Sequence, residues 1–217
     1  GFNPVNVLKG NFKTSGRGIT LRKSLVVFQF GISVVLIAAT LIVTKQLDFI
    51  QHKKLGFDRE NTIIHPLDKR TDEVFETLKS EFKRSGGALY VSRGSESPSD
   101  IKAGYGVNTA DSEGPGVITT GLMADDEYIP ALGMEMLAGR NFTRADMEAF
   151  AKDTIRTYIV NEAALKALFI PMDEAVGVQL SLLGQKGEVI GVIKDFHFSS
   201  LHTTIGPPVI FPVGKQF

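Results

Sequence analysis

An apolar run at residues 25–43 constrains the fold of this chain more than any other feature of its sequence. The run contains no charged residue, and only Gln29, Ser33 and Thr40 are polar. The hydrocarbon core of a bilayer is about 30 Å thick and requires about 20 such residues in one helix. We therefore predict a transmembrane helix at residues 24–45. The membrane-helix residues are Leu25, Val26, Val27, Phe28, Phe30, Ile32, Leu36, Ile37 and Leu41.

The charges that flank the run indicate its orientation. Five Lys or Arg residues precede it, and the first acidic residue of the chain is Asp48. Residues 1–23 are therefore predicted to be a cytoplasmic connector, with the main domain across the membrane. The asymmetry is slight, because four Lys or Arg residues follow the run closely. Two alternatives stay open: a signal peptide, although its apolar core would be shorter and nearer the N-terminus, and a buried core helix, although this run is apolar on every face.

Composition excludes several classes of function. The chain has no cysteine, which rules out disulfides, thiolate metal sites and a cysteine nucleophile. Its formal net charge is zero, so no basic surplus points to nucleic acid as a partner. No nucleotide-binding motif is present either, because no Lys-Ser or Lys-Thr pair follows the glycines at residues 104–116. Any ATP-driven process would therefore require a separate subunit.

The residues after the apolar run predict a stalk and then a folded domain. Leu47, Ile50 and Leu55 continue the helical spacing up to Gly56, so residues 46–56 are predicted to be a helical stalk. Residues 57–217 are predicted to be an α+β domain, with βα units at both ends and an insertion at about 100–150. The expected strands are residues 61–67, 88–92, 117–122, 157–160, 179–183, 188–193 and 207–211. The expected helices are residues 72–84 capped by Thr71, 125–132, 144–152 capped by Thr143 with Asp146, and 163–169 capped by Asn161.

The densest cluster of polar and aromatic residues lies at 194–198. Asp195 and His197 could form an acid–base pair or bind a metal, but on a strand the alternation with Phe196 and Phe198 is also what a half-buried strand end requires. The next histidine, His202, is five residues further on, which does not fit the spacing of a helical zinc pair. A structural role is favoured over catalysis, and no catalytic, cofactor or metal site is predicted.

The order of several short motifs resembles the MacB/FtsX-type ABC transporter permeases, in the form common in Bacteroidota. The motifs are residues 21–30 at the start of the membrane helix, 46–57, 138–142, 160–164, and 189–198 with Ser200, Leu201 and Pro207. Together they cover nearly the whole chain. The motif residues, expected to stabilise turns, helix starts and strand ends, are Gly139, Arg140, Phe142, Asn161, Glu162, Gly191, Asp195, Phe196 and His197.

The resemblance implies a MacB-like periplasmic core domain, with a porter-like α/β subdomain and a smaller inserted subdomain, in the bacterial inner membrane. It further implies an ABC ATP-binding subunit as a partner, a permease homodimer or pseudo-dimer, and a periplasmic partner protein. The expected function is to transmit ATP-driven conformational change to a periplasmic substrate or partner in export, lipoprotein handling or efflux. Such a chain is not itself an enzyme. This excerpt from a longer protein would be the second periplasmic domain of a duplicated permease.

Two other classes of function remain as alternatives. One is a membrane-anchored extracytoplasmic sensor, whose stalk reports ligand binding; a concave pocket with converging polar groups would favour it. The other is a membrane-tethered hydrolase that uses Asp195 and His197.

Overall fold

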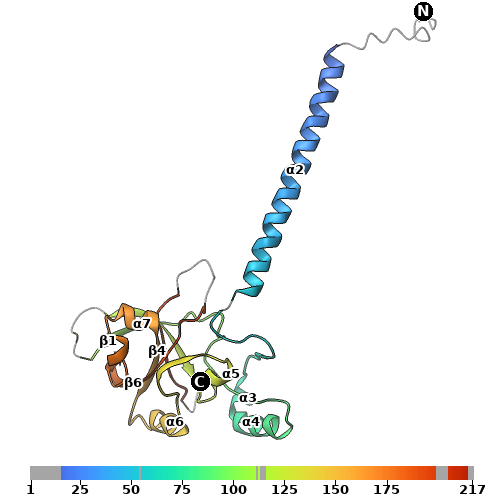
Figure 1. The fold of residues 1–217 in the computed structure, drawn as a ribbon. Coiled ribbons are helices and arrows are strands. Elements are labelled where there is room, and N and C mark those ends of the chain that lie inside the picture. Colours follow the sequence, from blue (N-terminus) through green and yellow to red (C-terminus); the bar gives the residue numbers. More distant parts are fainter. Residues whose placement is uncertain (1–15, 54, 111, 113–115, 199–204, 215–217) are drawn as a thin grey trace, which may run out of the picture. The chain divides into compact units, whose positions relative to one another are not determined.

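The computed structural model describes residues 16–53, 55–110, 112, 116–198 and 205–214 of the 217. The chain divides into two compact units, Gly1–Lys53 and Lys54–Phe217, which are described separately (Figure 1). Most of the predicted connector (residues 1–15) and the motif residues Ser200 and Leu201, with His202, lie outside the described residues.

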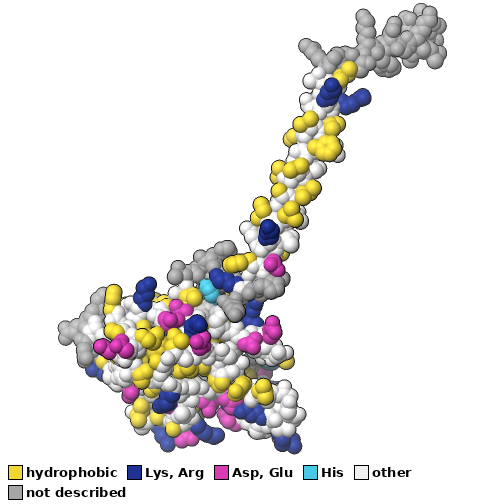
Figure 2. Space-filling view, viewed as in Figure 1, with side chains coloured by type: hydrophobic (Ala, Val, Ile, Leu, Met, Phe, Trp, Pro, Cys, Tyr) yellow, Lys and Arg dark blue, Asp and Glu magenta, His cyan; other side chains and the backbone are white. Residues whose placement is uncertain are grey.

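The first unit contains one long helix, α2 (Gly16–His52), of 37 residues. Its segment Gly18–Ile50 has a mean hydropathy of 2.5 and, among the described residues, is the one helix long and apolar enough to cross a membrane. The predicted membrane-helix residues are all exposed along it, and hydrophobic side chains follow its length between charged ends (Figure 2). At about 1.5 Å per residue the helix is about 55 Å long, well beyond the bilayer core.

The polar side chains of the apolar run are satisfied within the helix. The hydroxyls of Ser33 and Thr40 donate to the carbonyl oxygens of Gln29 and Leu36, at 2.9 and 2.8 Å. A hydroxyl bonded in this way removes the cost of an unpaired polar group in lipid. The helix ends at His52, four residues before the predicted end of the stalk at residue 56. Gly56 has a φ of +88° and lies outside the helix.

The second unit is built on one seven-stranded sheet in the order β3-β6-β4-β7-β2-β1-β5. The strands are β1 (Gly104–Thr109), β2 (Val117–Ala124), β3 (Met136–Gly139), β4 (Thr157–Asn161), β5 (Gln179–Leu182), β6 (Gln185–Ile193) and β7 (Pro208–Pro212). Because β5 also pairs with β6, six strands close into a ring, and β3 lies along the far end of β6. The β2–β7 and β4–β6 pairs are parallel and the others antiparallel.

Short helices connect these strands. They are α3 (Lys69–Glu73), α4 (Phe75–Arg84), α5 (Tyr128–Ala131), α6 (Arg144–Ala151), α7 (Glu162–Ala167) and the 3-10 helix η1 (Met172–Glu174). The sheet with these helices forms the mixed α/β domain that the sequence predicted. The predicted capping residues Thr143 and Asn161 are confirmed: the side chain of Thr143 accepts from the N–H of Asp146, and that of Asn161 from the N–H of Ala164.

The buried side chains form two clusters on opposite faces of the strands. Consecutive residues alternate between them: Ile159 and Ile210 join one cluster, and Val160 and Val209 join the other. Helix α5 packs into the first cluster and α7 into the second. This alternation buries both faces of β4 and β7, which explains why these strands are apolar throughout.

Two of the predicted strands were wrong. Residues 62–68 and 88–93 contain no regular secondary structure, so the predicted strand–helix–strand unit at the start of the domain does not form. Ile63 and Leu89 are 94% and 89% exposed. A segment of β-rich composition forms a strand only where it can pair with a neighbouring strand. No described strand pairs with either of these two segments.

Two turns also differ from the prediction. The helix start near Thr71 is capped by Asp68, whose carboxylate accepts from the N–H of Thr71 at 2.7 Å. Between the strands predicted at 179–183 and 188–193, the turn comprises only Leu183 and Gly184, with φ values of +53° and +78°. Two consecutive residues of positive φ define a type I′ turn, so β6 begins at once with Gln185.

The stretch 100–150, predicted to be an insertion, contributes β1, β2 and β3 to the same sheet as the C-terminal strands. The domain boundaries, the stalk and the insertion among them, stay predictions.

Candidate functional site

The chain that leaves helix α2 is fixed to the domain within a few residues. We call residues 55–58 the exit segment. The carbonyl oxygen of Leu55 accepts from the N–H of His197 at 2.7 Å, and the N–H of Asp58 donates to the carbonyl oxygen of Leu132, also at 2.7 Å. Phe57 packs edge-on against the buried Phe196, with ring centroids 6.4 Å apart. Backbone bonds and an aromatic contact thus hold the segment at both ends.

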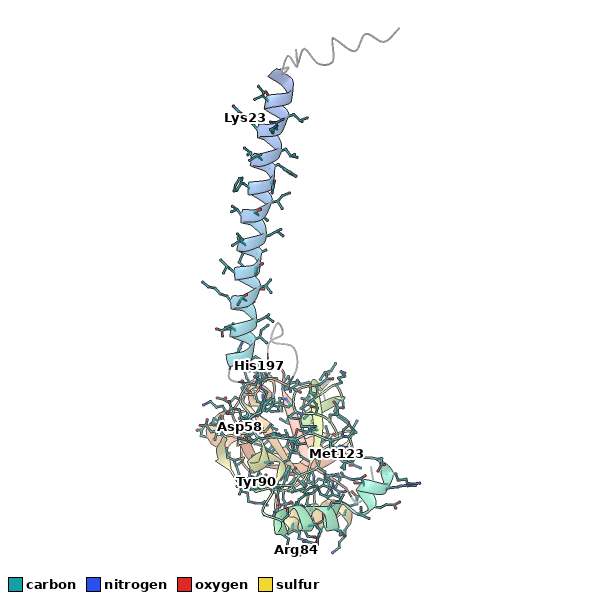
Figure 3. All side chains as sticks on the ribbon, turned by 90° about the vertical axis from the view of Figure 1, so that its right-hand side faces the viewer. Lys23, Asp58, Arg84, Tyr90, Met123 and His197 are labelled. Atoms are coloured by element: carbon teal, nitrogen blue, oxygen red, sulfur yellow. The ribbon has the colours of Figure 1, made fainter. Side chains whose placement is uncertain are left out.

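Gly56 makes this close approach sterically feasible. A Cβ atom at this position would lie 2.7 Å from the carbonyl oxygen of Asp195 and 2.8 Å from the Cα of Phe196. Its φ of +88° also lies in the left-handed region, which L-residues disfavour. The exit segment therefore packs backbone against backbone on the residues that follow β6. Figure 3 labels Asp58 and His197, both in the second unit.

Asp195, whose backbone lies against Gly56, binds the start of helix α7 through its side chain. Its Oδ1 accepts from the Nδ2 of Asn161 at 2.6 Å and from the N–H of Ala163 at 2.9 Å, while its own N–H donates to Glu162 at 3.1 Å. Burial, together with the charge of Glu162, raises the pKa of Asp195, against the opposing effects of the Ala163 N–H and His197. The carboxyl group therefore serves as a hydrogen-bond acceptor that organises the start of a helix.

Asn161 extends this network to the last strand. Its Oδ1 accepts from the N–H of Ala164 at 2.8 Å, and its Nδ2 donates to the carbonyl oxygen of Gly206 at 3.2 Å. The side chain is fully buried. Gly206 lies two residues before β7. One buried amide thus joins the start of α7, the approach to β7 and, through Asp195, the exit segment.

Two further motif glycines, Gly139 in β3 and Gly191 in β6, permit a second close approach between backbone segments. Gly139 has a φ of +71°, and a Cβ there would lie 2.2 Å from the carbonyl oxygen of Ile190; one at Gly191 would lie 2.4 Å from the carbonyl oxygen of Arg140. The N–H of Arg140 donates to the same Ile190 oxygen at 2.9 Å. Ile190 is the extra residue of a bulge where β6 pairs with β4. The two glycines therefore allow β3 to pair closely with β6 at this bulge.

Arg140 and Phe142 also stabilise the entry to α6. Both terminal nitrogens of Arg140 contact the carboxylate of Asp146, at 2.7 and 3.0 Å, and the N–H of Thr143 donates to the same carboxylate at 2.7 Å. Burial opposes ionisation of Asp146, but the bonds from Arg140 and Thr143 outweigh it and lower the pKa of this carboxyl. Phe142 is buried in the core cluster that holds Phe196.

The acid–base pair considered from the sequence does not take the predicted form. Strand β6 ends at Ile193, so Asp195 and His197 do not share a strand face. The carboxylate of Asp195 is engaged by Asn161 and Ala163. Among the described residues no group of three or more His, Asp or Glu side chains could hold a metal ion. The contacts of Asp195, Asn161 and His197 hold separate segments of the backbone together.

Sequence reasoning identified most residues of this network but not its contacts with the exit segment. Leu55 and Phe57 were noted only as part of the stalk and of a family motif, and Asp58 and Leu132 were not singled out, because backbone hydrogen bonds between distant segments leave no local signal. Gly56 was expected at the end of a helix, and a positive φ serves a close approach as well as a helix cap.

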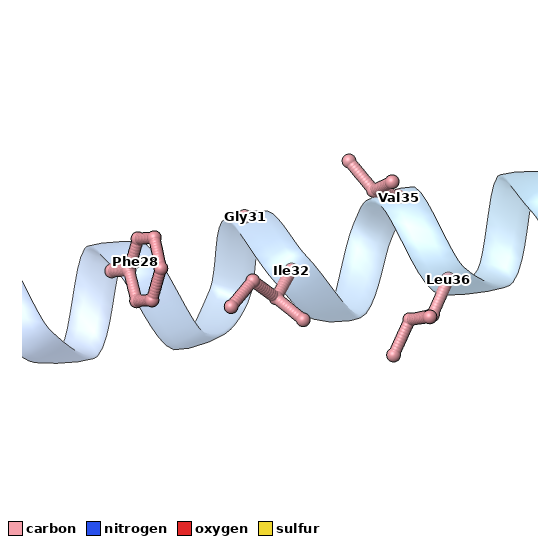
Figure 4. Close-up of a pocket in the computed structure, with 5 residues that line it drawn as sticks. All are labelled: Phe28, Gly31, Ile32, Val35 and Leu36. Carbon is pink, nitrogen blue, oxygen red and sulfur yellow. The ribbon is translucent and has the colours of Figure 1, made fainter.

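A hollow on α2 is lined by Phe28, Gly31, Ile32, Val35 and Leu36 (Figure 4). It lies where Gly31 lacks a side chain, and no described atom lies within 4 Å of the Cβ position there. The hollow is apolar and belongs to one helix.

A family model described as a MacB-like periplasmic core domain matches residues 30–216. This chain therefore belongs to the family of MacB-like periplasmic core domains, found in ABC transporter permeases. The match begins inside α2 and runs nearly to the end of the chain.

Several solved structures are similar to this chain, including the following three. The extracellular domain of the noncanonic ABC-type transporter YknZ from Gram-positive bacteria has 18% identity, a TM-score of 0.43, and coverage of 63% of this chain and 61% of its own. The periplasmic region of MacB from Actinobacillus actinomycetemcomitans has 16% identity, a TM-score of 0.40, and coverage of 61% and 53%. A domain of a putative permease from Porphyromonas gingivalis has 14% identity, a TM-score of 0.40, and coverage of 59% and 54%.

The chain thus spans between 53% and 61% of these structures. The family assignment rests on the family model, not on these distant similarities. No curated protein sequence matches the chain.

Proposed function

We propose that this chain is a membrane helix and periplasmic domain of an ABC transporter permease in the bacterial inner membrane. Its role is to transmit conformational change, driven by ATP hydrolysis in a separate ATP-binding subunit, to a periplasmic substrate or partner protein. Export, lipoprotein handling and efflux are the processes this action would serve. The permease works as a homodimer or pseudo-dimer, and this chain performs no catalysis of its own.

The exit segment is the observation that carries this proposal. Only Lys53 and Lys54 separate the end of α2 from Leu55, whose carbonyl oxygen is bonded to His197. A signal that travels along a helix is lost in a long unstructured linker, because such a linker absorbs displacement. Here the link is two residues long, and the segment that follows it is held at both ends within the domain.

The length of α2 supports the same proposal. The helix is about 25 Å longer than the hydrocarbon core it would cross. It is one continuous helix from Gly16 to His52, so displacement on the cytoplasmic side would reach the far end of the helix.

Copurification tests the proposal. The full-length parent protein is purified in mild detergent, its associated proteins are identified, and ATPase activity is assayed. Recovery of an ATP-binding subunit in stoichiometric amount, with ATPase activity, is the expected result. Recovery of the chain alone and without ATPase activity in several detergents would overturn the transporter proposal.

A further inference from the structure

Helices α3 and α4, which we call the arm, are attached to the domain with little apolar burial. Of the side chains in the two helices, only Phe75 is buried. Val74, between the helices, and Phe82, near the end of α4, are 49% and 54% exposed. The strands of the sheet, in contrast, bury both faces of β4 and β7. Apolar burial therefore stabilises the sheet far more than the attachment of the arm.

Several ion pairs connect the arm to the domain. The Nζ of Lys79 lies 3.2 Å from Asp125, 3.6 Å from Asp126 and 3.2 Å from Glu127, three consecutive acids between β2 and α5. Lys83, one turn further along α4, also contacts Glu127. The side chain of Lys79 is only 13% exposed. One lysine thus holds three carboxylates together, which would repel one another without it.

A second ion pair and two cation–π contacts surround Phe75. Arg93 contacts Asp72 of α3 at 2.7 Å. The guanidinium of Arg93 lies 5.1 Å from the centroid of the Phe75 ring, and the Nζ of Lys79 lies 6.0 Å from it. The one buried apolar side chain of the arm is therefore held between two cations, and both cations are also ion-pair donors.

The chain on both sides of the arm could act as a hinge. Residues 62–68 before it have no regular secondary structure, and after it Gly86 has a φ of +71° with no described atom within 4 Å of its Cβ position. From Val91 onwards the chain is again fixed, because the N–H of Val91 donates to Glu127 and the carbonyl oxygen of Arg93 accepts from the N–H of Asp125. The region between Arg84 and Val91 is therefore where the arm can rotate.

From these contacts we propose that the arm is a latch: it opens as a unit while the sheet stays folded, and the Lys79 ion-pair cluster holds it closed. Opening breaks the pairs to Asp125, Asp126 and Glu127 and uncovers these acids together with Phe75. The more exposed pairs of the cluster, Lys79–Asp126 and Lys83–Glu127, weaken with ionic strength, whereas buried apolar contacts do not. Opening therefore responds to salt while the sheet does not. This inference does not depend on the transporter proposal.

Native-state hydrogen exchange on the whole chain in detergent micelles tests the latch. In the unmodified protein we expect α4 amides to exchange faster than those of β4 and β6, and we expect raising NaCl from about 0.05 to 0.5 M to accelerate α4 alone. Lys79→Met keeps the apolar stem of the side chain and removes its charge. It should accelerate α4 exchange by about tenfold or more and leave β4 and β6 unchanged.

Lys102→Met is the matched control, because Lys102 is also ion-paired, to Asp100, but is 76% exposed and outside the arm. It should change neither region. Exchange of α4 and β4 at the same rate in the unmodified protein would overturn the latch, as would equal acceleration of α4 by the two substitutions. If Lys79→Met fails to fold, the salt comparison decides: acceleration of α4 alone supports the latch, and its absence overturns it.

Discussion

Gly56→Ala tests the close approach of the exit segment to the domain. The added methyl group would occupy space 2.7 Å from the carbonyl oxygen of Asp195 and 2.8 Å from the Cα and Cβ of Phe196. A left-handed conformation costs an L-residue about 1–2 kcal/mol, and forcing a methyl group into a packed site costs about 1–3 kcal/mol more. Neither backbone atom can move without disturbing the Asp195 network. We therefore expect the substitution to reduce the free energy of unfolding by about 2–5 kcal/mol.

Gly177→Ala separates the two contributions. Gly177 has a φ of +97°, close to that of Gly56, but no described atom lies within 4 Å of its Cβ position. It should lose only the conformational part, about 1–2 kcal/mol. With a urea m-value of about 2 kcal/mol per M, an additional loss of about 2 kcal/mol lowers the unfolding midpoint of Gly56→Ala by about 1 M relative to the control.

Tyrosine fluorescence is a suitable probe for this comparison. The chain has no tryptophan, and its four tyrosines all lie between residues 90 and 158, so the signal reports the domain and not α2. Equal midpoints for Gly56→Ala and Gly177→Ala would refute the reasoning, because they would mean that Gly56 is not in close contact with Asp195 and Phe196.

Three further substitutions test other parts of the network. Asn161→Ala removes a helix cap and leaves the buried Asp195 carboxyl without one donor, so the free energy of unfolding should fall by about 2–4 kcal/mol in urea titrations. The folded-state pKa of Asp146 is lowered, so its contribution is present above the unfolded-state pKa of about 3.9 and is lost as pH falls through the folded-state value. In Arg140→Met, the free energy of unfolding should therefore fall less steeply as pH decreases below about 4. An unchanged dependence of the free energy of unfolding on pH would contradict the ion pair. The Tyr128 hydroxyl is buried without a hydrogen-bond partner among the described residues. Tyr128→Phe should therefore raise the free energy of unfolding by about 1 kcal/mol, and a loss of stability would reveal an unseen partner.

Local signals account for what the sequence predicted correctly. The apolar run of α2, the capping box of α6, the Asn161 cap of α7 and the apolar strands β4 and β6 each depend on residues close together in the chain. Thr143 and Asp146, for example, are three residues apart and bond to each other. Such features are readable because their partners are fixed by the helix or strand itself.

Long-range contacts account for what the sequence did not predict. The segments 61–67 and 88–92 have β-rich compositions, but strand formation requires a partner strand, and no pattern within either segment reports whether one is present. The exit segment depends on a backbone bond between Leu55 and His197, which are 142 positions apart. Gly56 and Gly139 were noticed as glycines, but the atoms that require them belong to distant segments, Asp195 and Ile190.

The central proposal is that α2 transmits displacement to the domain, and the distance between two spin labels tests it most directly. The chain has no native cysteine, so Phe49→Cys in α2 and Ile155→Cys in the domain, both at exposed positions, can be labelled alone. Our account predicts a narrow distance distribution that broadens when Gly-Ser-Gly-Ser is inserted after Lys53, and not when the same four residues are inserted between Leu183 and Gly184. A distribution that is already broad, and that the insertion after Lys53 leaves unchanged, would contradict it.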